Sequence, residues 1–202
     1  KILYGAFQSK KAIRKQDECI LVEGYTDVIS LHQAGIENVV ASSGTSLTEG
    51  QLQLIKRNTS NLKILYDGDP AGIKAALRGL DLALAQDVNV KIVLLPDGAD
   101  PDSLVKKAGS QEQAKDFIFF KTELLLEETQ GDPIRKAGRI KDIMGSIALI
   151  PDPIKRSLYL KECSTLLDVS EQVLHEETNK LIATAYRKKA DREARQPQAA
   201  TD

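Results

Sequence analysis

The sequence lacks the features that place a chain in a membrane or in an oxidising compartment. No apolar run approaches the roughly 18 to 20 residues that span a bilayer, and nothing after Lys1 has the pattern of a signal peptide. Tryptophan is missing, and the only two cysteines, Cys19 and Cys163, do not have the spacing of zinc ligands. We expect a reduced, cytoplasmic protein without membrane contact, in which Cys19 is a buried free thiol.

The sequence also lacks an initiator and an excess of positive charge. Its only methionine is Met144, so we expect a piece of a longer protein. The 28 basic residues are balanced by 29 acidic ones, which gives a formal net charge of −1. Proteins that hold a phosphate backbone by overall charge are basic. Any contact with nucleic acid must therefore come from a local patch, a bound metal or parts outside this chain.

The first two thirds of the chain alternate short apolar runs with helical patterns. Strands are predicted at residues 19–22, 38–41, 62–66 and 88–95, and helices at residues 25–34, 47–57 and 70–85. Thr48 is a predicted N-cap, and Pro70 suits a first helical turn. This alternation predicts parallel strands joined by helical crossovers, in which ligands gather at the carboxyl ends of the strands.

From about Gln111 the pattern becomes helical throughout. Helices are predicted at residues 115–130, 133–150, 153–167 and 170–187. Pro151, Asp152 and Pro153 separate two of them, and Ser170 has the character of a helix start. We expect a small helical bundle followed by a polar tail that frays into solvent.

Acidic residues directly follow three of the predicted strands. Glu23 follows the first, Asp67 and Asp69 follow the third, and Asp100 and Asp102 lie on the predicted loop after the fourth. In a parallel sheet these carboxylates meet at one edge, where they repel one another unless a cation lies among them. Oxygen ligands without His or Cys favour Mg²⁺, or Mn²⁺ in its place.

Each of these sites also has an ordinary structural interpretation. Asp-Gly and Asp-Pro pairs are common in turns, and an acid after a strand often caps the next helix. A single pair would favour a turn. Three acidic sites at one sheet edge favour a functional site.

The acidic segments resemble the signature of the Toprim domain. They read Glu-Gly-Tyr-Thr-Asp at 23–27, Asp-Gly-Asp-Pro-Ala-Gly at 67–72 and Asp-Pro-Asp at 100–102. The stretches at 41–46 and 95–103, the opening at 3–5 with 10–13, and the helical segments at 150–153 and 159–162 are similar to bacterial replicative DNA primases of the DnaG type. The resemblance covers nearly the whole chain.

The resemblance implies an α/β fold, with a Toprim-type parallel sheet flanked by helices and then a small α-helical bundle. It implies four parts: the end of a preceding basic subdomain or linker (1–17), a Toprim catalytic domain (18–110), a helical subdomain (111–187) and a flexible polar tail (188–202). Zinc and the replicative helicase are expected to bind to domains outside this chain.

The activity that the resemblance implies is RNA primer synthesis on single-stranded DNA from ribonucleoside triphosphates. Glu23, Asp67 and Asp69 match the family's principal acidic residues, both catalytic and metal-binding. Asp100 and Asp102 match its third acidic motif. Asp27 matches the acid within the first motif, although a first-turn helix acid is the alternative.

Other residues are weaker candidates for contact with nucleotide or template. Gly44 and Thr45 follow the second strand, where a plain helix-entry loop is the alternative. Lys10 and Lys11 belong to a basic run with Arg14 and Lys15, which is more often a solvated helix face.

Two competing interpretations remain open. Another Toprim enzyme, such as a type IA topoisomerase or a nuclease, would share the acids, but no tyrosine here has the setting of a topoisomerase nucleophile. A non-enzymatic Toprim module would tend to lose some acids, and this chain keeps all three motifs. Because basic and zinc-bearing parts are missing, we expect little activity from this chain alone.

Overall fold

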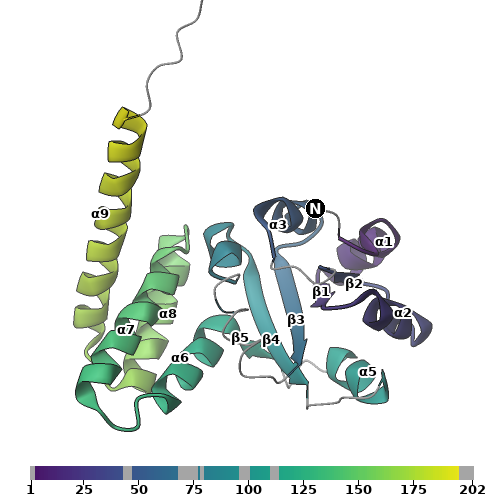
Figure 1. Ribbon diagram of the computed structural model, residues 1–202, viewed down its shortest axis with the longest axis horizontal. Coiled ribbons are helices and arrows are strands. Elements are labelled where there is room, and N and C mark those ends of the chain that lie inside the picture. The colour runs from purple at the N-terminus through teal and green to yellow at the C-terminus, as the bar shows by residue number, and fades with distance from the viewer. Residues whose placement is uncertain are drawn as a thin grey trace, which may run out of the picture. The chain divides into compact units, whose positions relative to one another are not determined.

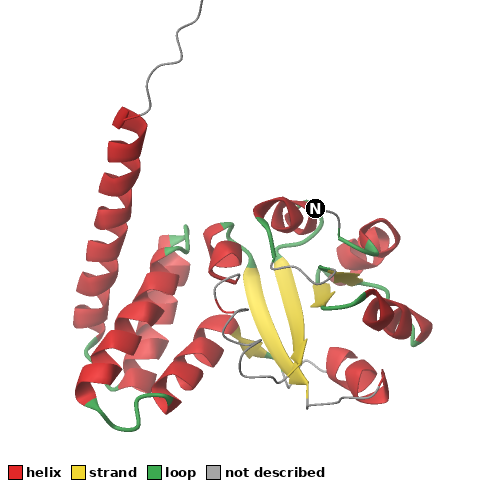
Figure 2. Cartoon of the chain, in the orientation of Figure 1, coloured by secondary structure: helices red, strands yellow, loops and turns green. Residues whose placement is uncertain are grey.

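A computed structural model describes residues 3–42, 47–67, 77, 80–95, 101–109 and 114–195, without the side chains of 66, 67, 101–103 and 192–195. Its contacts divide the chain into two compact units, Lys1–Leu124 and Leu125–Asp202. The first unit holds the sheet and the second is helical (Figures 1 and 2). In the described part of the chain, no helix combines the length and apolarity needed to cross a membrane.

The first unit is built on a sheet with the strand order β2-β1-β3-β4-β5. Its strands are β1 (Cys19–Val22), β2 (Val39–Ala41), β3 (Asn61–Asp67), β4 (Asn89–Leu95) and β5 (Lys115–Asp116). The first four pair in parallel, and β5 pairs antiparallel with β4. The predicted α/β fold with a parallel sheet is confirmed, with a short antiparallel edge strand added.

Helices cover the sheet. In chain order they are α1 (Ala6–Gln16), α2 (Tyr25–Gln33), α3 (Glu49–Lys56), helical residues 80–85, α5 (Pro101–Gly109) and α6 (Phe117–Glu127), the last of which crosses the division between the units. Thr48 caps α3 as predicted, by accepting a hydrogen bond from the Gln51 backbone N–H. The reciprocal bond, from the Thr48 N–H to the Gln51 side chain, completes a capping box.

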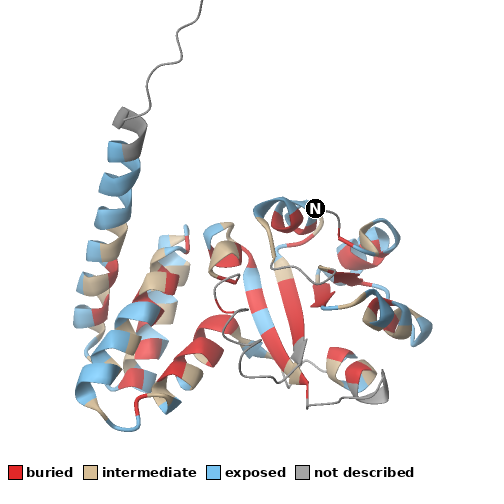
Figure 3. Ribbon diagram, viewed as in Figure 1, coloured by how far each residue is buried: buried red, intermediate tan, exposed pale blue. Residues whose placement is uncertain are grey.

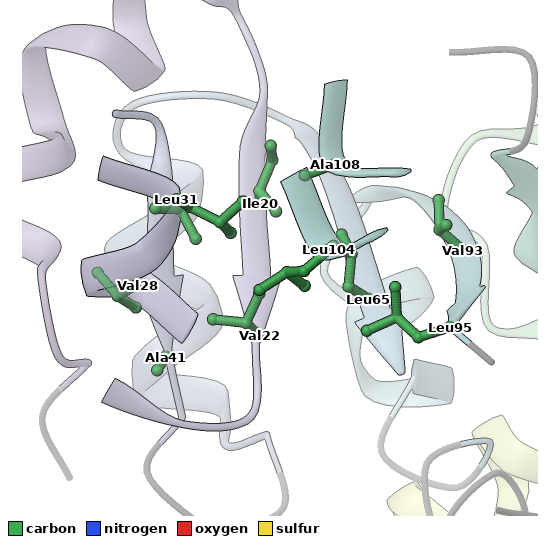
Figure 4. Close-up of a cluster of buried hydrophobic side chains, with 11 residues drawn as sticks. Ile20, Val22, Val28, Leu31, Ala41, Leu65, Val93, Leu95, Leu104 and Ala108 are labelled. Carbon is green, nitrogen blue, oxygen red and sulfur yellow. The ribbon is translucent and has the colours of Figure 1, made fainter. Parts of the chain in front are cut away.

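One buried cluster joins α2 and α5 to the sheet. Val28 and Leu31 of α2 and Leu104 of α5 lie among strand residues that include Val22 and Leu65 (Figure 4). Burying side chains of this size contributes about 1.5 to 3 kcal/mol each. The cluster therefore fixes the two helices that follow β1 and β4, and with them the residues at the start of each helix.

The segment before β1 is part of the first unit. Tyr4 forms an antiparallel bridge with Ala41, with backbone N···O distances of 3.0 and 3.1 Å. Ser9 of α1 donates a hydrogen bond to the Val39 carbonyl oxygen at 2.5 Å. The sequence predicted domain boundaries after residues 17 and 110, whereas the contacts divide the chain only after Leu124.

The second unit contains α7 (Pro133–Ala148), α8 (Pro153–Leu167) and α9 (Glu171–Arg195). Asp132 and Asp152 cap α7 and α8 in the same way, each accepting hydrogen bonds from two backbone N–H groups, with proline as the next residue. Their buried residues include Met144 and the free thiol Cys163, and Figure 3 shows the exposed opposite faces. The predicted helical bundle is confirmed.

Three local predictions were wrong. The expected loop after β4 is helix α5 from Pro101 onward, because Leu104 and Ala108 bury one face of a helix there. Lys115 does not begin a helix, since it pairs with Ile92 in β5 and α6 starts at Phe117. Finally, α9 continues to Arg195 instead of ending at Arg187, so the first half of the predicted flexible tail is helical.

Candidate active site at the carboxyl edge of the sheet

The strand order creates a ligand-binding position between β1 and β3. The chain passes from β1 to β2 on one side and then to β3 on the other side of β1. In open α/β sheets, ligands bind beyond the carboxyl ends of the strands where the order reverses in this way. Glu23 comes directly after β1, and Asp67 is the last residue of β3. The topology thus brings these two acids to the predicted edge.

The register places both acids at nearly the same height. Leu21 pairs with Ile64, so Glu23 is level with residue 66 and only one position behind Asp67. Asp67 also pairs with Leu95, the last residue of β4. Asp102 lies in the first turn of α5, which follows that strand after a short connection. Backbone position therefore agrees with the predicted gathering of three acidic motifs.

The turn that carries Glu23 is held by Asp27. Glu23 is exposed, and the next residue, Gly24, is the N-cap of α2. The Gly24 backbone N–H donates to Asp27 Oδ2 at 2.9 Å. A side-chain carbon on Gly24 would lie 3.2 Å from the same oxygen, which is closer than most such contacts. The structure thus gives Asp27 its helix-capping role, and metal binding by Asp27 stays a prediction.

A buried lysine holds the C-terminal end of α5. Lys63, in the middle of β3, is 1% exposed, and its ammonium nitrogen lies 2.9 Å from Glu18 Oε1. The same ammonium donates to the Ala108 carbonyl oxygen at 3.3 Å, near the C-terminus of α5. A cation at this end also interacts favourably with the helix dipole. Lys107 adds a second tie by donating to the Leu94 carbonyl oxygen at 2.7 Å.

Sequence reasoning missed Lys63 as a structural residue. An alternating Leu-Lys-Ile pattern usually indicates a lysine on an exposed face, but this sheet is covered by helices. Its partners, Glu18 and Ala108, are distant in sequence, and no local signal identifies them. The Tyr4–Ala41 bridge was missed for the same reason. The Leu104 and Ala108 spacing, by contrast, was a readable sign of helix α5.

Several predicted site residues cannot be placed. Asp69, Asp100, Gly44 and Thr45 lie outside the described residues, as do the side chains of Asp67 and Asp102. Among the described side chains, no group of three or more carboxylate, thiol or imidazole groups is placed to hold a metal ion. The metal ligand set therefore stays a prediction that rests on Glu23 and on the backbone positions.

The weaker basic candidates lie on α1. Lys10 and Lys11 are exposed, and Arg14 donates from Nε to Asn58 Oδ1 at 2.9 Å. The buried face of this helix consists of Ser9, Ala12 and Ile13. The basic run is thus a solvent-facing helix surface, as the ordinary interpretation expects, and contact with template or nucleotide stays a prediction.

Comparison with known families agrees with this architecture. A model described as Toprim-like matches residues 20–105, which run from β1 into α5. A second model, described as the DnaB-helicase binding domain of primase, matches residues 123–172. The sequence analysis expected the helicase to bind a domain outside this chain, and the place of helicase binding stays a prediction. The helical periodicity alone carried no sign of a partner.

Individual relatives point the same way. DNA primase from Halalkalibacterium halodurans is 37% identical over 88% of this chain and 31% of its own length. A DNA primase domain from Pseudomonas aeruginosa superimposes with a TM-score of 0.73 at 31% identity, over 91% of this chain and 59% of that one. A DnaG primase catalytic domain bound to single-stranded DNA gives 0.71 at 33% identity, over 84% and 57%.

The chain spans about a third of the length of the curated relatives that it matches. Within that span, the Toprim-like fold, the adjoining helical unit and the identities above 30% agree with one another. The chain belongs to the bacterial DnaG-type DNA primase family, as a fragment that holds its Toprim domain.

Proposed function

We propose that this chain is the catalytic core of a DNA-dependent RNA polymerase that makes short RNA primers on single-stranded DNA. One observation carries the proposal: Glu23 directly follows β1 and Asp67 ends the adjacent parallel strand β3, at the point where the strand order reverses. The reaction joins a ribonucleoside triphosphate to a 3′-hydroxyl and releases pyrophosphate. Family membership supports this activity.

The donor chemistry fits Mg²⁺, with Mn²⁺ as a substitute. Glu23, Asp67, Asp69, Asp100 and Asp102 offer carboxylate oxygens alone, which hard divalent ions prefer. Glu23 is an exposed residue at this edge, on a turn held by the Gly24–Asp27 hydrogen bond. Bound Mg²⁺ would supply charge stabilisation for the triphosphate and the leaving pyrophosphate. The protein's own part is to hold these acids together at one edge.

The proposed partners follow from the same family membership. Single-stranded DNA, ribonucleoside triphosphates and the growing RNA primer would meet at the carboxyl edge. The replicative helicase would contact residues 123–172, for which the helicase-binding model is the support. A cytoplasmic location follows from this replicative role.

Other Toprim functions fit less well. A topoisomerase, nuclease or DNA-binding assembly module would share the sheet and some of the acids. The match of residues 123–172 to a primase domain, next to the Toprim-like match, favours a primase.

Template-dependent ribonucleotide incorporation by the parent protein tests the proposal. Glu23→Gln should lower the rate at least about a hundredfold, because it removes a charged group at the reaction centre. Glu37→Gln, an exposed acid just before β2, is the matched control and should retain activity. Equal rates for both variants would remove the site assignment. This chain by itself should make few primers.

A further inference from the structure

We propose that the exposed aromatic side chains Tyr4, Phe7 and Tyr25, together with Lys10 and Lys11, form a surface that binds single-stranded nucleic acid. We call it the strand surface, after the nucleic-acid strand that would lie on it. The proposal rests on the proposed function and assigns part of the path of the nucleic acid to named residues. The bases would stack on the aromatic rings, and the lysines would contact the phosphates.

The two tyrosines lie at the carboxyl edge of the sheet. Tyr25 is two residues beyond Glu23, and Tyr4 pairs with Ala41, the last residue of β2. Their ring centroids are 6.0 Å apart in an edge-to-face arrangement. Tyr4 is 43% exposed and Tyr25 is 59% exposed, so the pair offers ring surface to solvent next to the candidate active site. Figure 1 shows β2 between α1 and α2 at this corner.

Helix α1 continues the surface with an aromatic and basic face. Phe7, Lys10, Lys11 and Arg14 are spaced i, i+3, i+4 and i+7, which puts them on one side of the helix. All four are exposed, and Phe7 is 89% exposed. The opposite face buries Ser9, Ala12 and Ile13. The face extends about 10 Å along the axis, which suits a strand better than a single nucleotide.

The composition of the chain makes this cluster unusual. Only 4% of the residues are aromatic, and four aromatic side chains are exposed among the described residues. Three of the four belong to the strand surface, and the fourth is Tyr186. Helix α1 carries four basic and no acidic residues, in a chain with net charge −1. Aromatic rings beside clustered cations are the pattern of sequence-tolerant single-strand binding.

Binding of a fluorescent oligothymidylate to the 202-residue chain, in chelator and at low salt, tests the strand surface. Without divalent ions, binding to the strand surface is measured apart from any metal-dependent binding at the acidic site. A negative result would therefore count against the strand surface and leave the proposed activity standing. Tyr25→Ala should weaken binding at least about fivefold, because stacking on an aromatic ring is lost. Tyr25→Phe should bind as the wild type does, because the ring remains.

Two matched controls exclude general effects. Tyr186→Ala removes a more exposed tyrosine, 72% against 59% for Tyr25, from the other unit and should bind normally. Lys10→Glu should weaken binding and flatten its salt dependence by roughly 0.7 in log–log slope, whereas the same substitution at the exposed Lys141 of α7 should do neither.

Each contrary outcome overturns the strand surface. These outcomes are no binding by the wild-type chain, equal binding by Tyr25→Ala and Tyr186→Ala, or displacement of the oligonucleotide by excess free ATP, which would indicate a nucleotide site. Thermal melting of each variant confirms that it is folded.

Discussion

The two edges of the sheet use their polar residues in opposite ways. At the amino edge, Thr59 donates to Asp17 Oδ1 at 2.8 Å, Asn61 donates to Asp17 Oδ2 at 3.1 Å, and Asn89 donates to Asn61 Oδ1 at 2.8 Å. At the carboxyl edge, Glu23 and Tyr25 are exposed residues on the turn after β1. The first arrangement stabilises the fold, and the second is the proposed ligand-binding side.

A pocket does not by itself identify a functional site. A pocket of about 360 Å³ opens at the amino edge, where its lining includes Asp17, Asn61 and Asn89. These side chains hydrogen-bond to one another, so a ligand would have to replace satisfied contacts. Parallel-sheet topology instead selects the carboxyl edge.

The largest expected effect concerns the buried Lys63–Glu18 pair near the amino edge. Lys63→Ala should lower the free energy of unfolding by about 3 to 5 kcal/mol, because it breaks the ion pair with Glu18 and opens a cavity. Urea unfolding measures the change. The double substitution Lys63→Met with Glu18→Gln should recover much of the loss, since no unpaired charge remains. A cost below 1 kcal/mol for Lys63→Ala would mean that the pair does not anchor the sheet.

A smaller effect tests how well the first residue of β1, Cys19, is buried beside the amino edge. Burial, with a contribution from the Glu18 charge, raises the pKa of the Cys19 thiol from 9.0 to about 12. The folded state therefore keeps this proton above pH 9, where the unfolded chain releases it. The resulting stability is complete below pH 9 and is lost as pH rises towards 12, by roughly 1 kcal/mol at pH 10.

Urea titrations at pH 8 and pH 10 check this dependence. Between pH 8 and pH 10, the free energy of unfolding of Cys19→Ala should fall less than that of the wild type. An equal change in stability between pH 8 and pH 10 for both proteins would show that Cys19 is open to solvent. Thiol alkylation of the native protein should likewise be slow at Cys19 and at the buried Cys163.

The smallest expected effect tests whether Asp27 only caps helix α2 or also binds metal. Asp27→Ala should cost about 1 kcal/mol, because the Gly24 N–H loses its acceptor. Asp27→Asn should retain most of the stability, since an amide oxygen can accept the same bond. Metal titration of Asp27→Asn then separates the two roles: wild-type affinity would leave capping as its only role, and weaker binding would make it a ligand as well.

The sequence predicted the parallel strands well because their apolar runs are local and sharply bounded. Residues 19–22 and 153–167 were predicted with the bounds that the structure has. Helix α5 was missed because Asp-Pro-Asp is also turn chemistry. Other features depend on distant partners: Lys63 is buried by Glu18 and Ala108, and Tyr4 is placed by Ala41. No pattern within a short window specifies such pairs.

The candidate site was predictable in position more than in detail. Acidic residues after successive parallel strands, with the family resemblance, led to Glu23, Asp67 and the later acids. The capping bond to Asp27 required the actual turn geometry. The proposed strand surface also required the structure, since Tyr4 and Tyr25 are distant in sequence and meet only because residue 4 pairs with β2.

The most direct test of the account is calorimetric titration of Mn²⁺ into the chain and into two variants, one at each edge. Asp67→Asn, at the carboxyl edge, should abolish most of the binding heat. Asp17→Asn, at the amino edge, should bind Mn²⁺ as the wild type does, at a temperature where it remains folded. Undiminished binding by Asp67→Asn, or its loss in Asp17→Asn, would contradict the assignment of the metal site to the carboxyl edge.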